Sequence, residues 1–90
     1  MIQLTHVRLS EGGTMLHHIT HFKWYQNSDG TMSTITRENL VAFLRNGNRA
    51  YVCDGHNISN CEVVDAQPTA YVRTVADKSQ TDNLLQLPRF

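Results

Sequence analysis

Cysteine, long apolar runs and an excess of charge of either sign are all scarce in this chain. Its 90 residues include two cysteines, too few for the disulfide framework of a small secreted domain. No apolar stretch approaches the roughly 20 residues that a membrane-spanning helix needs. The first residues also lack the basic and then apolar pattern of a secretory leader. We therefore expect a cytoplasmic protein with no membrane partner, whose thiols stay reduced.

The charges balance, with eight Lys and Arg residues against eight Asp and Glu residues. Proteins that bind duplex nucleic acid usually neutralise several phosphates and show a basic stripe, which is not visible here. The sequence thus argues against general nucleic-acid binding, and against a polybasic membrane patch for the same reason.

The length allows one domain, residues 1–90, with a modest core. Seven aromatic residues and an apolar fraction of 40% still favour a folded chain over a disordered one. Because so small a core is often completed by another subunit, we expect a homo-oligomer.

One helix is predicted at residues 37–46. Thr36 is a good N-cap, Glu38 places a negative charge in the first turn, and Gly47 can take the left-handed conformation that ends a helix. The apolar residues recur at helical spacing on one broad face: Leu40, Val41, Phe43 and Leu44.

Alternating and β-branched residues predict strands elsewhere. The predicted strands are residues 2–9, 15–25, 49–53, 60–66 and 70–75, and residues 31–35 form only a short extended piece. This order, ββ-α-βββ, predicts an α+β fold: a mostly antiparallel sheet of four to five strands with one helix packed on one face.

Four of the five histidines fall between residues 6 and 21. On a strand, His17 and His21 would lie on one face but about 13 Å apart, too far for one metal ion. His6 could face the 18–21 region across a hairpin, which allows a two-histidine site, whereas zinc wants three or four ligands. We expect half-exposed strand histidines, with no metal and no cofactor.

The two cysteines, Cys53 and Cys61, flank a predicted turn, so a disulfide between them is geometrically possible. Neither lies in a CxxC motif, and both are expected to be thiols without chemistry. With no phosphate loop, paired carboxylates or activated nucleophile in the sequence, we expect a protein that is not an enzyme.

Polar residues cluster near the end of the chain, and they are the candidate ligand-binding residues: Arg73, Thr74, Asp77, Lys78, Thr81, Asp82 and Asn83. Arg73 would serve as a fork for an anion, and the hydroxyl and amide groups would donate hydrogen bonds. The alternative is structural: Arg73 pairs with Asp77 or Asp82 to hold the tail, and Asp82 caps a helical turn.

The tail also carries a resemblance. Residues 71–77, 81–85 and 87–88 read YVRTVAD, TDNLL and LP. Together with Thr5-His6-Val7, His18-Ile19-Thr20 and Asn46-Gly47, this pattern resembles a small bacterial and phage family of unknown function. The resemblance implies a stand-alone small domain and brings no activity, cofactor or catalytic residue.

Two functions stay open from the sequence. The first is a non-catalytic module that binds a small polar or nucleotide-derived ligand through the tail cluster, as a phage or mobile element would sequester a signalling nucleotide. The alternative is a protein-interaction or inhibitor module that docks a host protein through a sheet edge or the Phe22-Trp24-Tyr25 patch.

Overall fold

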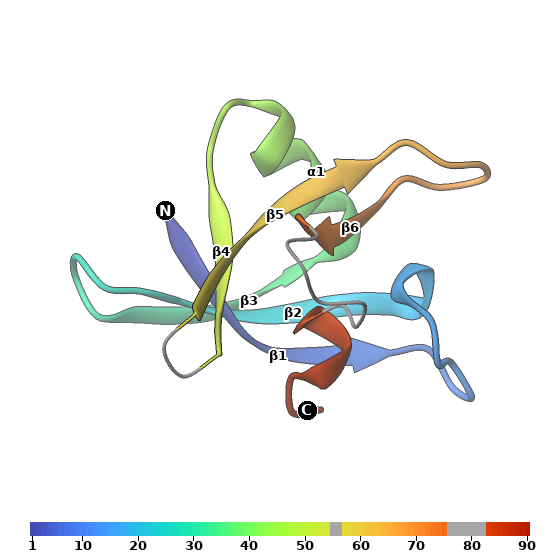
Figure 1. Ribbon diagram of the computed structural model, residues 1–90, viewed down its shortest axis with the longest axis horizontal. Coiled ribbons are helices and arrows are strands. Elements are labelled where there is room, and N and C mark those ends of the chain that lie inside the picture. Colours follow the sequence, from blue (N-terminus) through green and yellow to red (C-terminus); the bar gives the residue numbers. More distant parts are fainter. Residues whose placement is uncertain (55–56, 76–82) are drawn as a thin grey trace.

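The computed structural model describes residues 1–54, 57–75 and 83–90. Within these residues it holds six strands, one α-helix and two short 3-10 helices (Figure 1). In chain order these are β1 (Ile2–Leu9), η1 (Leu16–His18), β2 (Ile19–Gln26), β3 (Thr31–Thr36), α1 (Arg37–Arg45), β4 (Ala50–Asp54), β5 (Asn57–Val64), β6 (Tyr71–Thr74) and η2 (Asn83–Gln86).

The strands form one mixed sheet in the order β3-β2-β1-β4-β5-β6. All neighbours are antiparallel except β1 and β4, which run parallel and pair Ile2 with Ala50 and Gln3 with Tyr51. The predicted sheet, mostly antiparallel with four to five strands, was therefore wrong in strand number and order. The parallel pair arises because α1 carries the chain from the β3 edge past β2, so that β4 enters on the far side of β1.

The sequence predicts only a short extended piece at residues 31–35, but the structure has a full strand there, β3. Every one of its six residues pairs with β2, from Thr31 opposite Gln26 to Thr36 opposite His21. Only two of these residues, Met32 and Ile35, are large and apolar, so the segment lacks the alternation that marks a half-buried strand. This strand is stabilised by backbone hydrogen bonds to β2, which the local pattern of apolar residues does not predict.

A β-bulge in β1 explains why the apolar pattern of that strand is irregular. The register with β2 shifts between Leu4 and His6, and one residue too many stands on β1 there. Because an extra residue inverts the alternation, Ile2, Leu4 and Val7 all turn to the interior, with 6%, 0% and 0% of their surfaces exposed.

The helix prediction is confirmed, with α1 ending one residue earlier than expected. The Thr36 hydroxyl accepts a hydrogen bond from the Asn39 backbone N–H at 3.2 Å, as an N-cap does. At the other end Asn46 caps the helix and Gly47 takes a φ of 87°. Among the described residues, no helix has the length and apolar character needed to cross a membrane.

The buried apolar side chains of the core come from β1, β2, β4, β6 and α1, and η2 packs into this core from the front in Figure 1. Leu84 of η2 is fully buried. The last residues then run beside β1, where the Val7 N–H donates to the Pro88 carbonyl at 3.0 Å and the Phe90 N–H to the Val7 carbonyl at 3.2 Å. The end of the chain is thus part of the fold.

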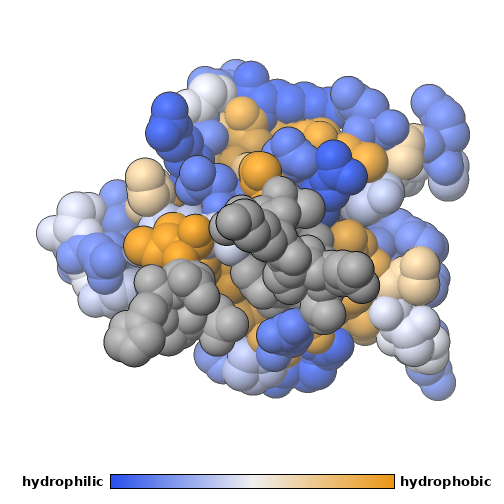
Figure 2. Space-filling model, in the orientation of Figure 1, coloured by the Kyte–Doolittle hydropathy of each residue, from blue (hydrophilic) through white to orange (hydrophobic). Residues whose placement is uncertain are grey.

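The described part of the face shown in Figure 2 is mainly hydrophilic. On the face shown in Figure 2 the described apolar atoms form separate areas among hydrophilic ones. The large apolar side chains that stay exposed are spread along the chain: Met1, Met15, Met32, Ile58 and Val75.

Candidate functional site

The predicted tail cluster is described at two side chains. Arg73 is exposed on β6, and its Nε donates to Oε1 of Glu62 at 2.7 Å, directly across the β5–β6 pair. Thr74 is 5% exposed and turns to the interior. Asn83 is the first residue of η2, and the other four residues of the cluster lie outside the described residues: Asp77, Lys78, Thr81 and Asp82.

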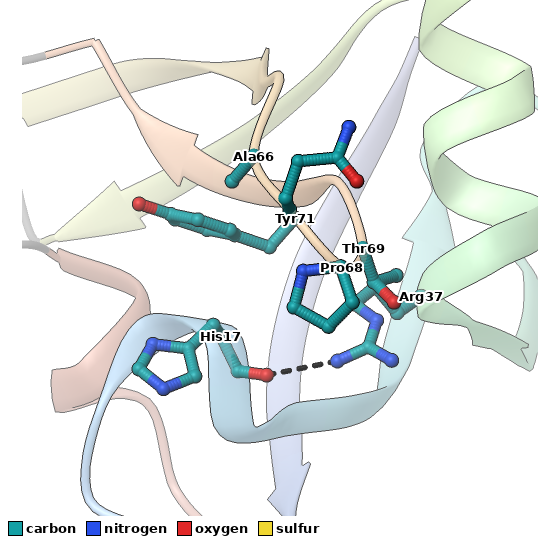
Figure 3. Close-up of a pocket in the computed structure, with 7 residues that line it drawn as sticks. His17, Arg37, Ala66, Pro68, Thr69 and Tyr71 are labelled. Carbon is teal, nitrogen blue, oxygen red and sulfur yellow. Dashed lines mark hydrogen bonds between the residues drawn. The ribbon is translucent and has the colours of Figure 1, made fainter.

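A cleft of about 460 Å³ lies elsewhere, between η1 and the loop that joins β5 to β6 (Figure 3). Residues from η1, from the start of α1, and from the β5–β6 loop and the start of β6 meet there, although these segments are distant in the sequence. The lining residues are His17, Arg37, Ala66, Gln67, Pro68, Thr69 and Tyr71.

A tight turn positions His17. The backbone N–H groups of Thr14 and Met15 both donate to Nδ1 of His18, at 2.9 and 3.0 Å, which closes η1. Gly13 is required in this turn, since a Cβ there would lie 2.6 Å from the His18 Cβ. His17 is left exposed at the cleft, so the predicted strand 15–25 begins with a helical turn instead.

Arg37 forms one wall of the cleft. Its Nη1 donates to the His17 carbonyl at 2.8 Å, and its Nη2 donates to Oε1 of Glu38 at 3.2 Å. Only 18% of the Arg37 side chain is exposed, and its Nε is buried without a hydrogen-bond partner among the described residues. A guanidinium carries five N–H donors, so this side chain has donors left over for a further partner.

The carboxylate beside Arg37 stays ionised. A hydrogen bond from its own backbone N–H is the largest effect and lowers the pKa of Glu38; partial burial acts in the opposite direction, and the hydrogen bond and charge of Arg37 lower the pKa further. The side chain of Glu38 is largely exposed and does not line the cleft. The Glu38 carboxylate therefore offsets part of the Arg37 charge from a position outside the cleft.

The opposite wall comes from the β5–β6 loop and the start of β6. Figure 3 shows the Pro68 ring between the Tyr71 ring and the Arg37 guanidinium, with the His17 imidazole below the phenol. The His17 and Tyr71 ring centroids are 6.1 Å apart at an angle of 60°. Beyond the loop, an ion pair between Arg45 and Asp65 borders a second hollow of about 380 Å³.

The chemistry of the cleft is that of a donor-rich site with flat apolar surfaces. Arg37 supplies a cation, Thr69 and Tyr71 supply hydroxyls, and Gln67 supplies an amide. None of the described lining residues carries a carboxylate. This combination suits an anion attached to a planar ring.

Sequence reasoning missed this site because no motif connects its residues. His17 falls within the predicted strand 15–25, and Arg37 is the first residue of the predicted helix 37–46. The one signal was Tyr71, which opens the YVRTVAD run at the end of the chain.

Two further histidines, His6 on β1 and His21 on β2, lie on the outer side of that strand pair. Nδ1 of His6 is hydrogen-bonded to Oγ1 of Thr5, and Nδ1 of His21 to Oγ1 of Thr20, each at 2.9 Å. Among the described residues, no three His, Cys, Asp or Glu side chains come together as metal ligands would.

The two cysteines do not face each other. Cys53 stands opposite Ile58 in the β4–β5 pair, and Cys61 stands opposite Thr74 in the β5–β6 pair. Both carry thiols in this structure.

Comparison with known protein families shows to which family the chain belongs. The model of the family described as "Protein of unknown function (DUF3892)" matches residues 3–88. The chain belongs to the DUF3892 family. The resemblance to a family of unknown function is thereby confirmed, and the DUF3892 match includes every residue that lines the cleft. The comparisons with curated proteins and with solved structures gave no match.

Proposed function

We propose that this DUF3892 domain is a non-catalytic binding module for a small anionic ligand, of the nucleotide-derived class, held in the cleft between η1 and the β5–β6 loop. The observation that carries the proposal is Arg37: a mostly buried cation with an unsatisfied Nε, at a cleft whose described walls contain no carboxylate. The hydrogen bonds to the His17 carbonyl and to Glu38 use one N–H of each Nη group, and an anion in the cleft would accept charge-assisted hydrogen bonds from the Nη N–H groups that remain.

Each wall has a part in this proposal. The Arg37 guanidinium would pair with a phosphate or carboxylate group, because its planar fork matches such anions. The tilted rings of His17 and Tyr71 would contact the flat face of a base, and Thr69 and Gln67 would hydrogen-bond its edge. The cleft volume of about 460 Å³ is within the usual range for small-molecule sites.

The non-catalytic part of the proposal rests on what lines the cleft. Neither serine nor cysteine is among the described lining residues, and His17 has no carboxylate partner there. Binding without turnover would suit a bacterial or phage protein that sequesters a signalling nucleotide in the cytoplasm.

The test is a thermal-shift screen followed by calorimetry. The probes are inorganic phosphate, adenosine monophosphate, cyclic adenosine monophosphate and a cyclic dinucleotide. A ligand that binds only the native state at one hundred times its Kd should stabilise by about 2.7 kcal/mol, which is roughly 10–20 °C in Tm for a domain of this size. If none of these probes raises Tm, the proposal is wrong.

Variants locate the site. Arg37→Gln and Tyr71→Ala should abolish the ligand-dependent shift, and Arg49→Gln, a change at an exposed arginine outside the cleft, should leave it unchanged. Loss of the shift in Arg73→Gln but not in Arg37→Gln would move the ligand to the C-terminal polar cluster.

A protein-interaction or inhibitor module is the second candidate. It is favoured by an apolar hollow of about 290 Å³ whose lining includes Trp24, Ile35 and Phe43. Of the predicted Phe22-Trp24-Tyr25 patch, Phe22 is fully buried and so is not part of the surface. Such a module would show no ligand-dependent shift in Tm and would co-elute with a purified protein partner.

A further inference from the structure

The two edges of the sheet differ in how they are covered. The β6 edge is four residues long and packs against α1, η1 and η2. The β3 edge is six residues long and pairs with β2 in an unbroken register. Among the described residues nothing pairs with its other side, and residues 31–34 are exposed. Alternate residues of such an edge present unpaired N–H and C=O groups.

The β3 edge also lacks the usual features that prevent pairing with another strand. Natural edges are commonly protected by lysine, proline or a bulge. The β3 sequence, TMSTIT, has no charged residue and no proline, and its register with β2 contains no bulge. Four of its six residues are β-branched, which favours extended backbone. Met32 remains 62% exposed.

We propose that β3 pairs antiparallel with β3 of a second copy of the chain, about a twofold axis at Ser33, so that two six-stranded sheets become one. Residues directly opposite each other in a sheet lie on the same face, and side chains along one strand alternate between the two faces. When β3 pairs with itself, the numbers of two opposite residues must therefore differ by an even number. Thr36 is already used as the N-cap of α1. The usable edge is therefore residues 31–35, and its centre is Ser33.

This register is self-complementary. It sets Met32 opposite Thr34 of the other copy, Thr31 opposite Ile35, and Ser33 opposite itself, so every pair is uncharged. On β2, the Lys, Arg, Asp or Glu residue that pairs with β3 is Lys23, opposite Thr34, and the two β2 strands of the dimer would be three strand spacings or about 14 Å apart. That separation exceeds the Debye length of about 8 Å at physiological ionic strength. An interface that matches itself in this way is what a twofold dimer requires.

The dimer goes beyond the ligand proposal and is independent of it. None of residues 31–35 lines the cleft, so either proposal can fail while the other stands. Pairing would also bury part of the exposed Met32 surface and extend a core that is small for an isolated domain.

The first experiment measures the oligomeric state by sedimentation equilibrium over a range of concentrations. The unmodified chain should be a dimer, and Ser33→Lys should weaken dimerisation at least tenfold because it places two lysines face to face. Ser10→Lys, at an exposed serine outside the sheet, is the matched control and should remain dimeric. A monomer at every concentration, or a dimer that Ser33→Lys leaves intact, would overturn the proposal.

The second experiment fixes the axis and does not depend on a lysine being tolerated. In a chain with Cys53→Ser and Cys61→Ser, the substitution Ser33→Cys places two thiols opposite each other. Directly opposite Cα atoms are about 4.5–5.5 Å apart, which lies within the range of disulfides. Mild oxidation should yield a covalent dimer with Ser33→Cys and not with Ser10→Cys. Equal yields from the two variants would refute pairing at Ser33.

Discussion

Replacing Leu84 by alanine tests whether the end of the chain is part of the folded core. Leu84 lies in η2, is fully buried, and its helix packs against β4 and β6. The segment that follows it reaches β1, where Val7 exchanges backbone hydrogen bonds with Pro88 and Phe90. Leu84→Ala therefore leaves a cavity and also loosens the segment that closes the core.

The size of the effect follows from its burial. A fully buried Leu→Ala change costs about 2–5 kcal/mol, through lost transfer free energy and the cavity left behind. A domain of this length has a free energy of unfolding of about 5–13 kcal/mol. A loss of about 3 kcal/mol would lower Tm by roughly 12–24 °C. Leu85, which is only partly buried, is the matched control, and Leu85→Ala should cost clearly less.

The assay is urea unfolding followed by circular dichroism, with the unfolding free energy of each variant taken from curves of equal slope. A cost below about 1 kcal/mol for Leu84→Ala is the level of an average exposed or half-exposed substitution. That result, or equal costs for Leu84→Ala and Leu85→Ala, would show that η2 is not docked in solution as it is in the structure.

Three further measurements test local interactions. Thr36→Ala should lower the unfolding free energy by about 1 kcal/mol through loss of the N-cap, and Thr36→Ser should retain most of it; equal losses in the two variants would contradict the cap. In a double-mutant cycle, Arg73→Ala and Glu62→Ala should show a coupling of about 0.2–1 kcal/mol, as exposed pairs do; strictly additive effects would show that the ion pair contributes nothing. The pKa of Glu38 is lower in the folded chain than in the unfolded one, so its contribution is present above the unfolded value and is lost as the pH falls through the acid range below about 4. Urea midpoints across that range should fall more steeply for the unmodified chain than for Glu38→Gln, and parallel curves would show that Glu38 is not involved.

The features that the sequence determined by itself are the local ones. The helix at 37–45 depends on a cap at Thr36, an apolar face and a stop at Gly47, all within about a dozen residues. Membership of a family of unknown function also followed from residues along the chain, and the family match supports it. Signals of this kind act over a few residues and so survive without knowledge of the rest of the chain.

The features that only the tertiary structure decided involve residues far apart. The β3 strand exists because β2 offers it hydrogen bonds, and the bulge near Leu4 decides which residues of β1 are buried. Neither follows from local propensity, because strand pairing depends on the neighbour more than on the strand itself.

The candidate site shows the same division. Within the predicted tail cluster, Arg73 turned out to pair with Glu62 across β5 and β6, and Thr74 to lie in the interior. The cleft instead joins His17 of η1 to Arg37 and Tyr71, which follow 20 and 54 residues later. These side chains meet because the β5–β6 hairpin folds back over η1 and α1, and that closure is a property of the whole packed chain rather than of any one segment.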